Sequence, residues 1–230
     1  MNQYAEKQLE ETNRIEDNFK SGNSPSQIVD PVDDYANDNR LCLTSIVFLP
    51  NNITQKINSE ILQPLKKLDE RQYFFLPESM HITINNIRVI NDPPHFTEEE
   101  IEKVKEVFRN VVSKHKSINF DLKGLWDLPT SLAIKAFTDE SFGNLVMELR
   151  EELNNAGVPD DKSYGSNEVV IGSSTIIRYT TKPNELFFQK IKELKDIEIG
   201  EVNLSEIKLI TTNAVNHPSK TKIIESYKLS

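Results

Sequence analysis

A histidine and a threonine alternate with isoleucines in the segment Met80–Ile84. Successive side chains of a strand point to opposite faces, so His81 and Thr83 share one face while the isoleucines point into a core. An imidazole moves a proton near neutral pH, and a hydroxyl donates a hydrogen bond to an oxygen. The segment therefore predicts a strand whose polar face can handle a phosphate.

A later segment repeats half of this pattern. By the same alternation Ser173 and Thr175 share one face, together with Tyr179 further along, whereas Arg178 points away from that face in an ideal strand. The repeat keeps a hydroxyl at Thr175 but has Ser173 in the place of a histidine. A serine hydroxyl donates a hydrogen bond but does not titrate near pH 7. The second segment therefore lacks the proton-transfer group that the first one has.

Composition narrows the classes of function. The chain has 230 residues, 37% of them hydrophobic and 27% charged, with a net charge of −9 and a pI near 5.1. Non-specific nucleic-acid binding depends on Lys and Arg, so a general DNA- or RNA-coating protein is excluded. No apolar run reaches the ~20 residues of a membrane span. The first residues do not have the basic-then-apolar pattern of a secretory signal. Cys42 is the single cysteine, and we expect it in the core. We therefore predict a cytoplasmic protein, and a monomer.

The sequence predicts neither a metal nor an organic cofactor. His, Cys, Asp and Glu residues do not recur at metal-ligand spacing, and the seven glycines form no phosphate-binding loop. Among the aromatic residues, Tyr164 is the candidate for stacking on a base because it lies in a polar, glycine-containing loop. We expect Phe74 and Trp126 in the core.

The chain divides at about residue 40. Residues 1–40 are polar and acidic, and we expect a mobile or loosely docked arm, partly disordered or with one short helix. Residues 41–230 alternate between strand-like and helical patterns. The expected strands comprise residues 41–49, 73–89, 118–122, 132–136, 169–180, 202–212 and 223–229. The expected helices comprise residues 53–68, kinked or divided at Pro64, and 97–111, 142–153 and 184–194.

This order predicts an α+β fold. A strand with a polar motif, a turn, a helix and further strands occur twice, so we expect a single bilobal domain. Each lobe would hold an antiparallel sheet with outer helices, and the two motif strands would border a central cleft.

At these residues the chain resembles the 2H phosphoesterase superfamily, which includes 2′-5′ RNA ligase-like proteins and RNA 2′,3′-cyclic phosphodiesterases. The signature of that superfamily is two His-x-Thr/Ser-hydrophobic motifs, one in each lobe. Residues 81–84 match the first motif fully, and residues 173–176 match the second except at Ser173. The resemblance covers residues 41–229.

The resemblance implies a metal-independent reaction on a cyclic phosphodiester or a 2′-5′ linkage of a small nucleotide or RNA end. It makes His81 the acid or base, and Thr83 and Thr175 the groups that hold the phosphoryl oxygens. Ser173 stands where the second catalytic histidine belongs. Loss of one general acid or base commonly costs about 10²–10⁴-fold in rate.

Three other groups are candidates for the missing role. Arg178 could stabilise phosphoryl charge, Tyr179 could donate a proton, and His217 could approach from its turn. Three functions remain open: a phosphodiesterase that uses His81, a nucleotide- or phosphate-binding protein without turnover, and an interaction protein that acts through residues 1–40.

Overall fold

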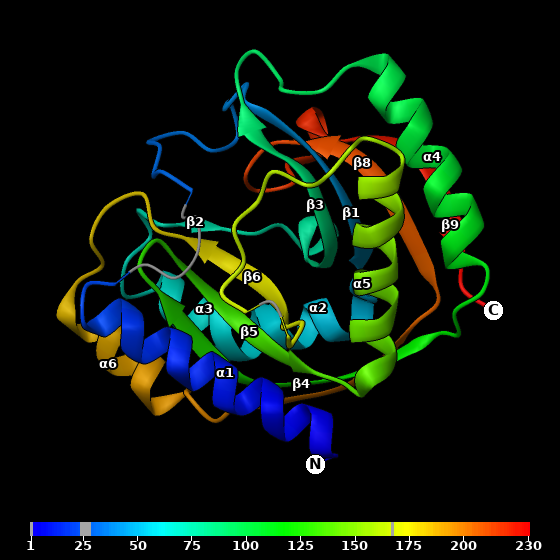
Figure 1. Cartoon of the computed structure of the whole chain (residues 1–230). Coiled ribbons are helices and arrows are strands. Elements are labelled where there is room, and N and C mark those ends of the chain that lie inside the picture. The colour runs from blue at the N-terminus through cyan, green and yellow to red at the C-terminus, as the bar shows by residue number, and fades with distance from the viewer. Residues whose placement is uncertain (1, 24–28, 167) are drawn as a thin grey trace.

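The computed structural model describes residues 2–23, 29–166 and 168–230, which form two antiparallel sheets flanked by helices (Figure 1). One sheet, sheet A, has the strand order β3 (His81–Asn91), β1 (Leu41–Phe48), β8 (Glu206–Thr212) and β9 (Lys222–Lys228). The other, sheet B, has the order β2 (Tyr73–Phe74), β6 (Gly172–Arg178), β5 (Ser131–Phe137), β4 (Ile118–Leu128) and β7 (Glu198–Leu204). The predicted α+β, bilobal arrangement is confirmed.

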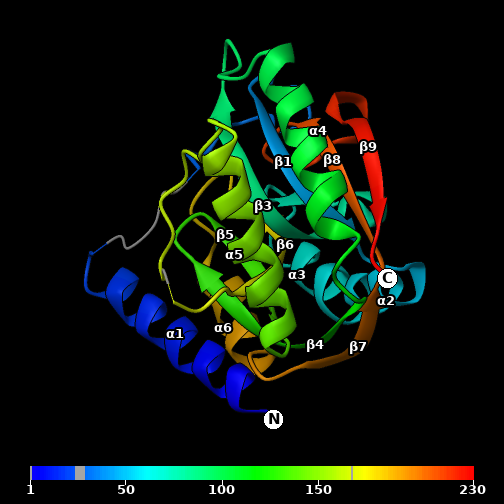
Figure 2. The ribbon, with the colours of Figure 1, turned by 45° about the vertical axis from the view of Figure 1, so that its right-hand side comes forward.

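Helices pack on both sheets. Figures 1 and 2 show α4 and α5 side by side, and these helices contact β9 and β3 respectively. Helix α2 contacts β7, and α3 contacts α6. The bounds are α1 (Gln3–Lys20), α2 (Asn51–Ile57), α3 (Gln63–Lys66), α4 (Glu98–Val112), α5 (Glu140–Asn155) and α6 (Glu185–Glu193), with 3₁₀ turns at Pro77–Ser79 and Pro218–Lys220. None of the described helices is long and apolar enough to cross a membrane.

Two local predictions have clear structural outcomes. The Thr97–Glu100 capping box opens α4 as expected, with both reciprocal hydrogen bonds formed. The helix that begins at Asn51 is divided ahead of Pro64 by a π-helical segment, Asn58–Leu62, which leads into α3 without a break. The changed hydrogen-bond pattern of this segment accommodates the missing N–H of Pro64.

The prediction of a single strand over residues 202–212 is wrong. Two strands meet at Ser205, where the chain passes from one sheet to the other: β7 is an edge strand of sheet B, and β8 lies inside sheet A. Both halves alternate buried and less buried side chains, and the sequence pattern therefore looked continuous. A strand that passes from one sheet to another keeps its period, so periodicity could not reveal the change.

Residues 1–40 contain a longer helix than the sequence suggested, and α1 is docked on β4 and β5. Gln8 is 1% exposed, and its side-chain amide bonds two backbone groups. Its Nε2 donates to the carbonyl of Val170 at 2.8 Å, and its Oε1 accepts from the N–H of Thr138 at 3.0 Å. Polar contacts within a buried contact surface specify one docking position, because an unmade hydrogen bond there is costly.

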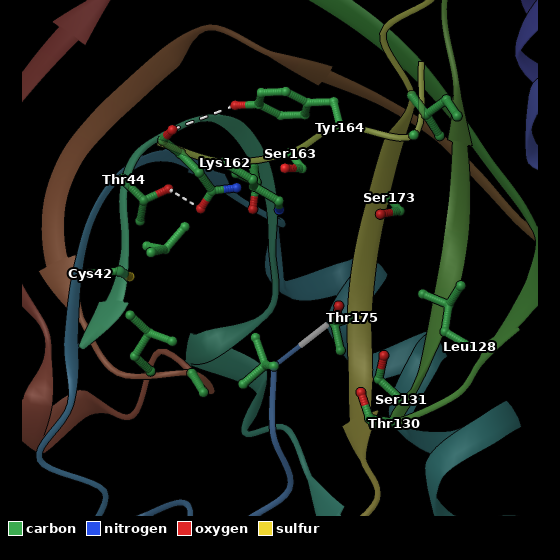
Figure 3. A pocket seen from close by; sticks show the side chains of 18 of the residues that line it. Cys42, Thr44, Leu128, Thr130, Ser131, Lys162, Ser163, Tyr164, Ser173 and Thr175 are labelled. Atoms are coloured by element: carbon green, nitrogen blue, oxygen red, sulfur yellow. Dashed lines mark hydrogen bonds between the residues drawn. The ribbon is translucent and has the colours of Figure 1, made fainter. Parts of the chain in front are cut away.

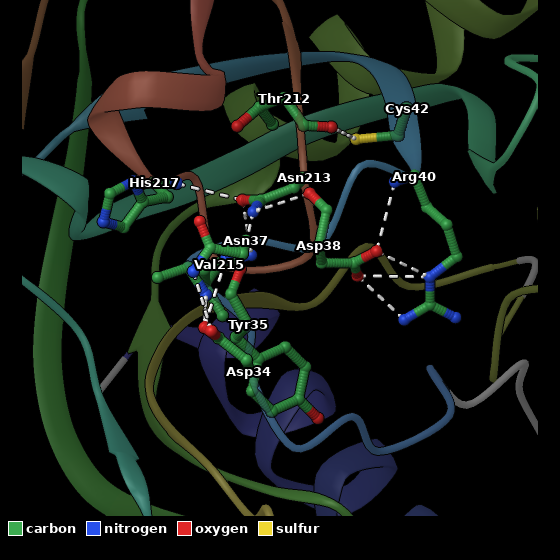
Figure 4. A network of polar contacts seen from close by, with 11 residues as sticks. Asp34, Tyr35, Asn37, Asp38, Arg40, Cys42, Thr212, Asn213, Val215 and His217 are labelled. Atoms are coloured by element: carbon green, nitrogen blue, oxygen red, sulfur yellow. Dashed lines mark hydrogen bonds and ion pairs between the residues drawn. The ribbon is translucent and has the colours of Figure 1, made fainter.

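The segment before β1 is also anchored. Asn213, just after β8, donates through Nδ2 to the carbonyl of Tyr35 at 2.7 Å (Figure 4). The ring of Tyr35 is 1% exposed and meets Tyr73 edge-on. Asp38 and Arg40 form a two-pronged ion pair beside it. The described part of residues 1–40 therefore packs on the domain, and residues 24–28 lie outside the described residues.

Candidate functional site

The two motif strands border one cavity of about 510 Å³. His81 and Thr83 reach it from β3, an edge strand of sheet A. Ser173 and Thr175 reach it from β6, and Figure 3 shows both side chains directed into the same space. The predicted polar face of each motif strand is thus a wall of the cavity.

His81 is held in one orientation by the backbone. Its Nδ1 lies 2.7 Å from the carbonyl oxygen of Ser79, an acceptor, so Nδ1 carries the proton. Burial, assisted by the charge of Arg178, lowers the pKa of His81, and the bond to Ser79 opposes this shift. The imidazole is therefore neutral at pH 7, with Nε2 left as a proton acceptor. This geometry suits a general base better than a general acid.

A β-bulge in β6 reverses the predicted faces of Arg178 and Tyr179. Thr175 pairs with Ala133 on β5, but the next pair is Ile177 with Leu132, which leaves one extra residue in β6. An extra residue shifts every later side chain to the opposite face. Arg178 consequently lines the cavity with Thr175, and the prediction that it points away is wrong.

Tyr179 lies on the far side of the sheet. Its hydroxyl donates to Asp127 Oδ1 at 2.7 Å, its ring packs edge-on against Phe187 and Phe188 of α6, and it is 5% exposed. It is not among the cavity-lining residues. The prediction that Tyr179 shares the face of Ser173 is therefore wrong, and Tyr179 stays away from any ligand in the cavity.

The cavity is positively charged although the whole chain carries a net charge of −9. Among its described lining residues the single carboxylate is Asp30, against four cations other than histidine: Arg40, Arg150, Lys162 and Arg178. A concave site with one sign of charge concentrates ligands of the opposite sign.

Two of these cations have carboxylate partners. Arg40 pairs with Asp38 at 2.8 Å, and Arg150 lies 3.6 Å from Asp160. The buried Nε atoms of Arg150 and Arg178 both lack a hydrogen-bond partner among the described residues. Arg178 differs from Arg150 because it also forms no ion pair with a described carboxylate. A buried charge without a partner is costly to the fold, so its presence in a cavity indicates an anionic ligand.

Lys162 is a cavity residue that sequence reasoning missed. Burial and the charge of Arg178 lower its pKa to about 8. The charge of Arg178 also lowers the pKa of His81, so the same guanidinium disfavours the protonated form of both side chains. The polar loop 158–166 has no periodic pattern, and Lys162 reaches the cavity only because this loop folds beside it, as Figure 3 shows.

Tyr164 lines the cavity and anchors this loop. Its hydroxyl oxygen lies 3.1 Å from Asn85 Oδ1 and 3.0 Å from Asp160 Oδ2, and its single proton is available to either acceptor. The guanidinium of Arg150 lies 3.6 Å from the centroid of its ring. The side chain is thus held among protein groups, and its stacking on a base stays a prediction.

His217 lies outside the cavity and is not among its lining residues. It caps the 3₁₀ turn Pro218–Lys220, where its Nδ1 lies 2.8 Å from Ser219 Oγ. Trp126 is buried as expected but also lines the cavity. Cys42 lines it too, with its Sγ donating to the carbonyl of Thr212 and its pKa raised to about 11 by burial. Among the described residues no three His, Cys, Asp or Glu side chains are grouped to hold a metal ion.

Comparison with solved structures identifies the fold. A protein of Thermus thermophilus superposes with a TM-score of 0.57 at 16% identity, covering 83% of this chain and 97% of the other. The LigT protein of Escherichia coli gives 0.55 at 12%, covering 84% and 99%, and has also been solved with 3′-AMP and with ATP. A conserved protein of Agrobacterium tumefaciens gives 0.57 at 15%, covering 81% and 85%. No protein-family model and no curated protein matches the sequence.

The chain therefore has the fold of the LigT-type 2H phosphoesterases, as the motif resemblance implied. The Thermus thermophilus structure leaves about a sixth of this chain unmatched. At these identities the comparison defines the fold alone.

Proposed function

We propose that the cavity binds the phosphate of a small nucleotide or RNA end and that the protein hydrolyses a cyclic phosphodiester there. The observation that carries this proposal is the buried guanidinium of Arg178, which faces the cavity without a partner for its Nε among the described residues. The solved complexes of LigT with 3′-AMP and ATP support a nucleotide as the ligand class.

The phosphate would lie between the two motif strands. Thr83 and Thr175 donate hydroxyl hydrogen bonds to the non-bridging oxygens, one from each sheet. Arg178 supplies a charge-assisted contact, which is about twice as strong as a neutral one. Ser173 adds a donor but no titrating group.

The proton transfers would be divided between His81 and Lys162. His81 Nε2 takes a proton from a water molecule as the water oxygen bonds to phosphorus. The bond from phosphorus to one sugar oxygen breaks, and that oxygen takes a proton from the ammonium of Lys162. The products are a phosphomonoester and a free sugar hydroxyl, and solvent restores both side chains. Lys162 thus replaces the acid that Ser173 cannot provide.

Hydrolysis of a 2′,3′-cyclic mononucleotide by the pure protein tests this function. We expect turnover by the wild type, with a phosphomonoester as the product on chromatography. A wild type that binds a nucleotide without turning over the cyclic substrate would contradict the proposal that the protein is a phosphodiesterase.

In that case Ser173→His is informative, because it restores the imidazole at the second motif. Turnover by this variant but not by the wild type would support the alternative function, a nucleotide-binding protein. Such a protein would keep the fold but lack catalysis because Ser173 stands in place of the second histidine.

The pH profile tests the assignment of the two proton-transfer groups. Below the lowered pKa of His81 the base is protonated, and above about pH 8 Lys162 loses its proton, so the rate should fall on both sides. Lys162→Arg keeps the charge but does not titrate, so the alkaline fall should disappear and the maximal rate should drop. An unchanged alkaline limb in Lys162→Arg would show that another group donates the proton.

A further inference from the structure

The part of the cavity wall where α1 meets β4 forms an apolar end. Ile15, Trp126 and Ala133 form a cluster separate from the main core, with Phe19, Leu128 and Ile171 packed against it. Of these six residues, all except Ala133 line the cavity. Ile15 and Phe19 come from α1, so the N-terminal helix is a wall of the same cavity that holds His81.

Strand register connects this apolar end to the phosphate site. Directly paired residues of antiparallel strands point to the same face. One row across β4, β5 and β6 runs Trp126, Ala133, Thr175. The next row runs Leu128, Ser131, Arg178.

Each row therefore begins with a large apolar side chain on β4 and ends with a phosphate-site residue on β6. Two strand spacings separate the ends, about 10 Å. A molecule with an anionic group at one end and a flat apolar group at the other matches this surface.

Trp126 also presents a polar group that the fold leaves unused. It is 7% exposed, and its buried Nε1 has no hydrogen-bond partner among the described residues. A buried indole N–H normally finds an acceptor. Nucleobases combine an aromatic ring with acceptor atoms on its edge, so they satisfy both the apolar wall and this donor.

We propose that α1 and β4 form a nucleobase subsite, in which Phe19 and Leu128 contact the ring and the N–H of Trp126 donates to an acceptor on its edge. This subsite rests on the proposed function, because it places the base of the nucleotide whose phosphate lies at Thr175 and Arg178. The docking of α1 is then part of ligand recognition, since Phe19 reaches the cavity only from the docked helix.

The contacts of α1 hold this wall in place. Arg14 donates to the carbonyl of Gly165 at 2.6 Å, in the loop that carries Lys162. A Cβ at Gly165 would lie 2.6 Å from Ile15 Cδ1, so the helix and the loop approach as closely as a glycine allows. The helix thus supports both the apolar wall and the loop with the proposed proton donor.

The single tryptophan of the chain gives a direct measurement. We expect 3′-AMP to change the fluorescence of Trp126, and inorganic phosphate to bind without a comparable change. Base contacts of this kind are worth about 1–3 kcal/mol, so Phe19→Ala should weaken 3′-AMP binding by about 5–150-fold in calorimetry. Its affinity for inorganic phosphate should stay within about twofold of the wild type, because inorganic phosphate has no base to contact Phe19.

A matched control separates base contact from helix docking. Leu9→Ala shortens another apolar side chain of α1 that is not among the cavity-lining residues, and it should leave both affinities unchanged. Trp126→Phe keeps a ring but removes the N–H, and it should weaken 3′-AMP selectively. Thermal unfolding of each variant checks that the chain still folds.

The outcomes separate the two proposals. Binding of 3′-AMP without a fluorescence change, and with equal affinity in Phe19→Ala, would overturn the base subsite while leaving the phosphate site intact. Failure of the wild type to bind either 3′-AMP or inorganic phosphate would overturn the proposed function, and the subsite with it.

Discussion

Replacement of His81 by alanine is expected to lower the turnover of a 2′,3′-cyclic mononucleotide by about 10²–10⁴-fold, the usual effect of removing a general base. The imidazole is neutral and fixed by the carbonyl of Ser79, so Nε2 is ready to accept a proton. Affinity for 3′-AMP should change much less, because the phosphate is held by hydroxyls and by Arg178. Steady-state rates and calorimetry on the same preparation separate these two effects.

The matched control is His95→Ala. His95 is exposed in the turn before α4, and it is not among the cavity-lining residues. Its removal should leave both rate and affinity unchanged. Equal turnover by His81→Ala and wild type would rule out His81 as the base, whatever the ligand.

Arg178→Met is expected to weaken nucleotide binding without destabilising the fold. A hydrogen bond to a charged group is worth about 1.5–3 kcal/mol, so the loss of the guanidinium should raise the Kd for 3′-AMP by about 10–150-fold. The same change removes a buried charge that lacks a partner for its Nε among the described residues. Replacing such a charge by an apolar side chain of similar length is often neutral or stabilising.

The combination of weaker binding and an unchanged or raised unfolding temperature distinguishes a ligand-binding arginine from a structural one. Arg109→Met is the comparison, because Arg109 forms an exposed two-pronged pair with Glu225, and its loss should leave ligand affinity unchanged and stability nearly so. A marked loss of stability in Arg178→Met with unchanged affinity would assign Arg178 to the fold instead.

Local residue patterns were sufficient for much of the site. The alternation around His81 and Thr83 predicted a polar strand face, and the structure has that face as a cavity wall. Ser173 and Thr175 were predicted by the same rule and line the same cavity. Strand alternation and helical periodicity depend on neighbours along the chain, so they also predicted the order of most elements and the two-sheet fold.

The rest depended on contacts between residues far apart in the chain. The bulge after Thr175 exchanges the faces of Arg178 and Tyr179, and strand periodicity contains no signal for one extra residue. Lys162 acquires its lowered pKa from burial and from Arg178, both products of loop folding.

The N-terminal helix shows the same division between local and tertiary information. Its apolar residues predicted a helix, but its docking depends on the buried amide of Gln8 and on backbone groups of Thr138 and Val170. Sequence therefore determined which residues could do phosphate chemistry and the strands that carry most of them. Tertiary packing decided which side chains share the cavity, because desolvation, register and long-range charge exist only once the two sheets and α1 have come together.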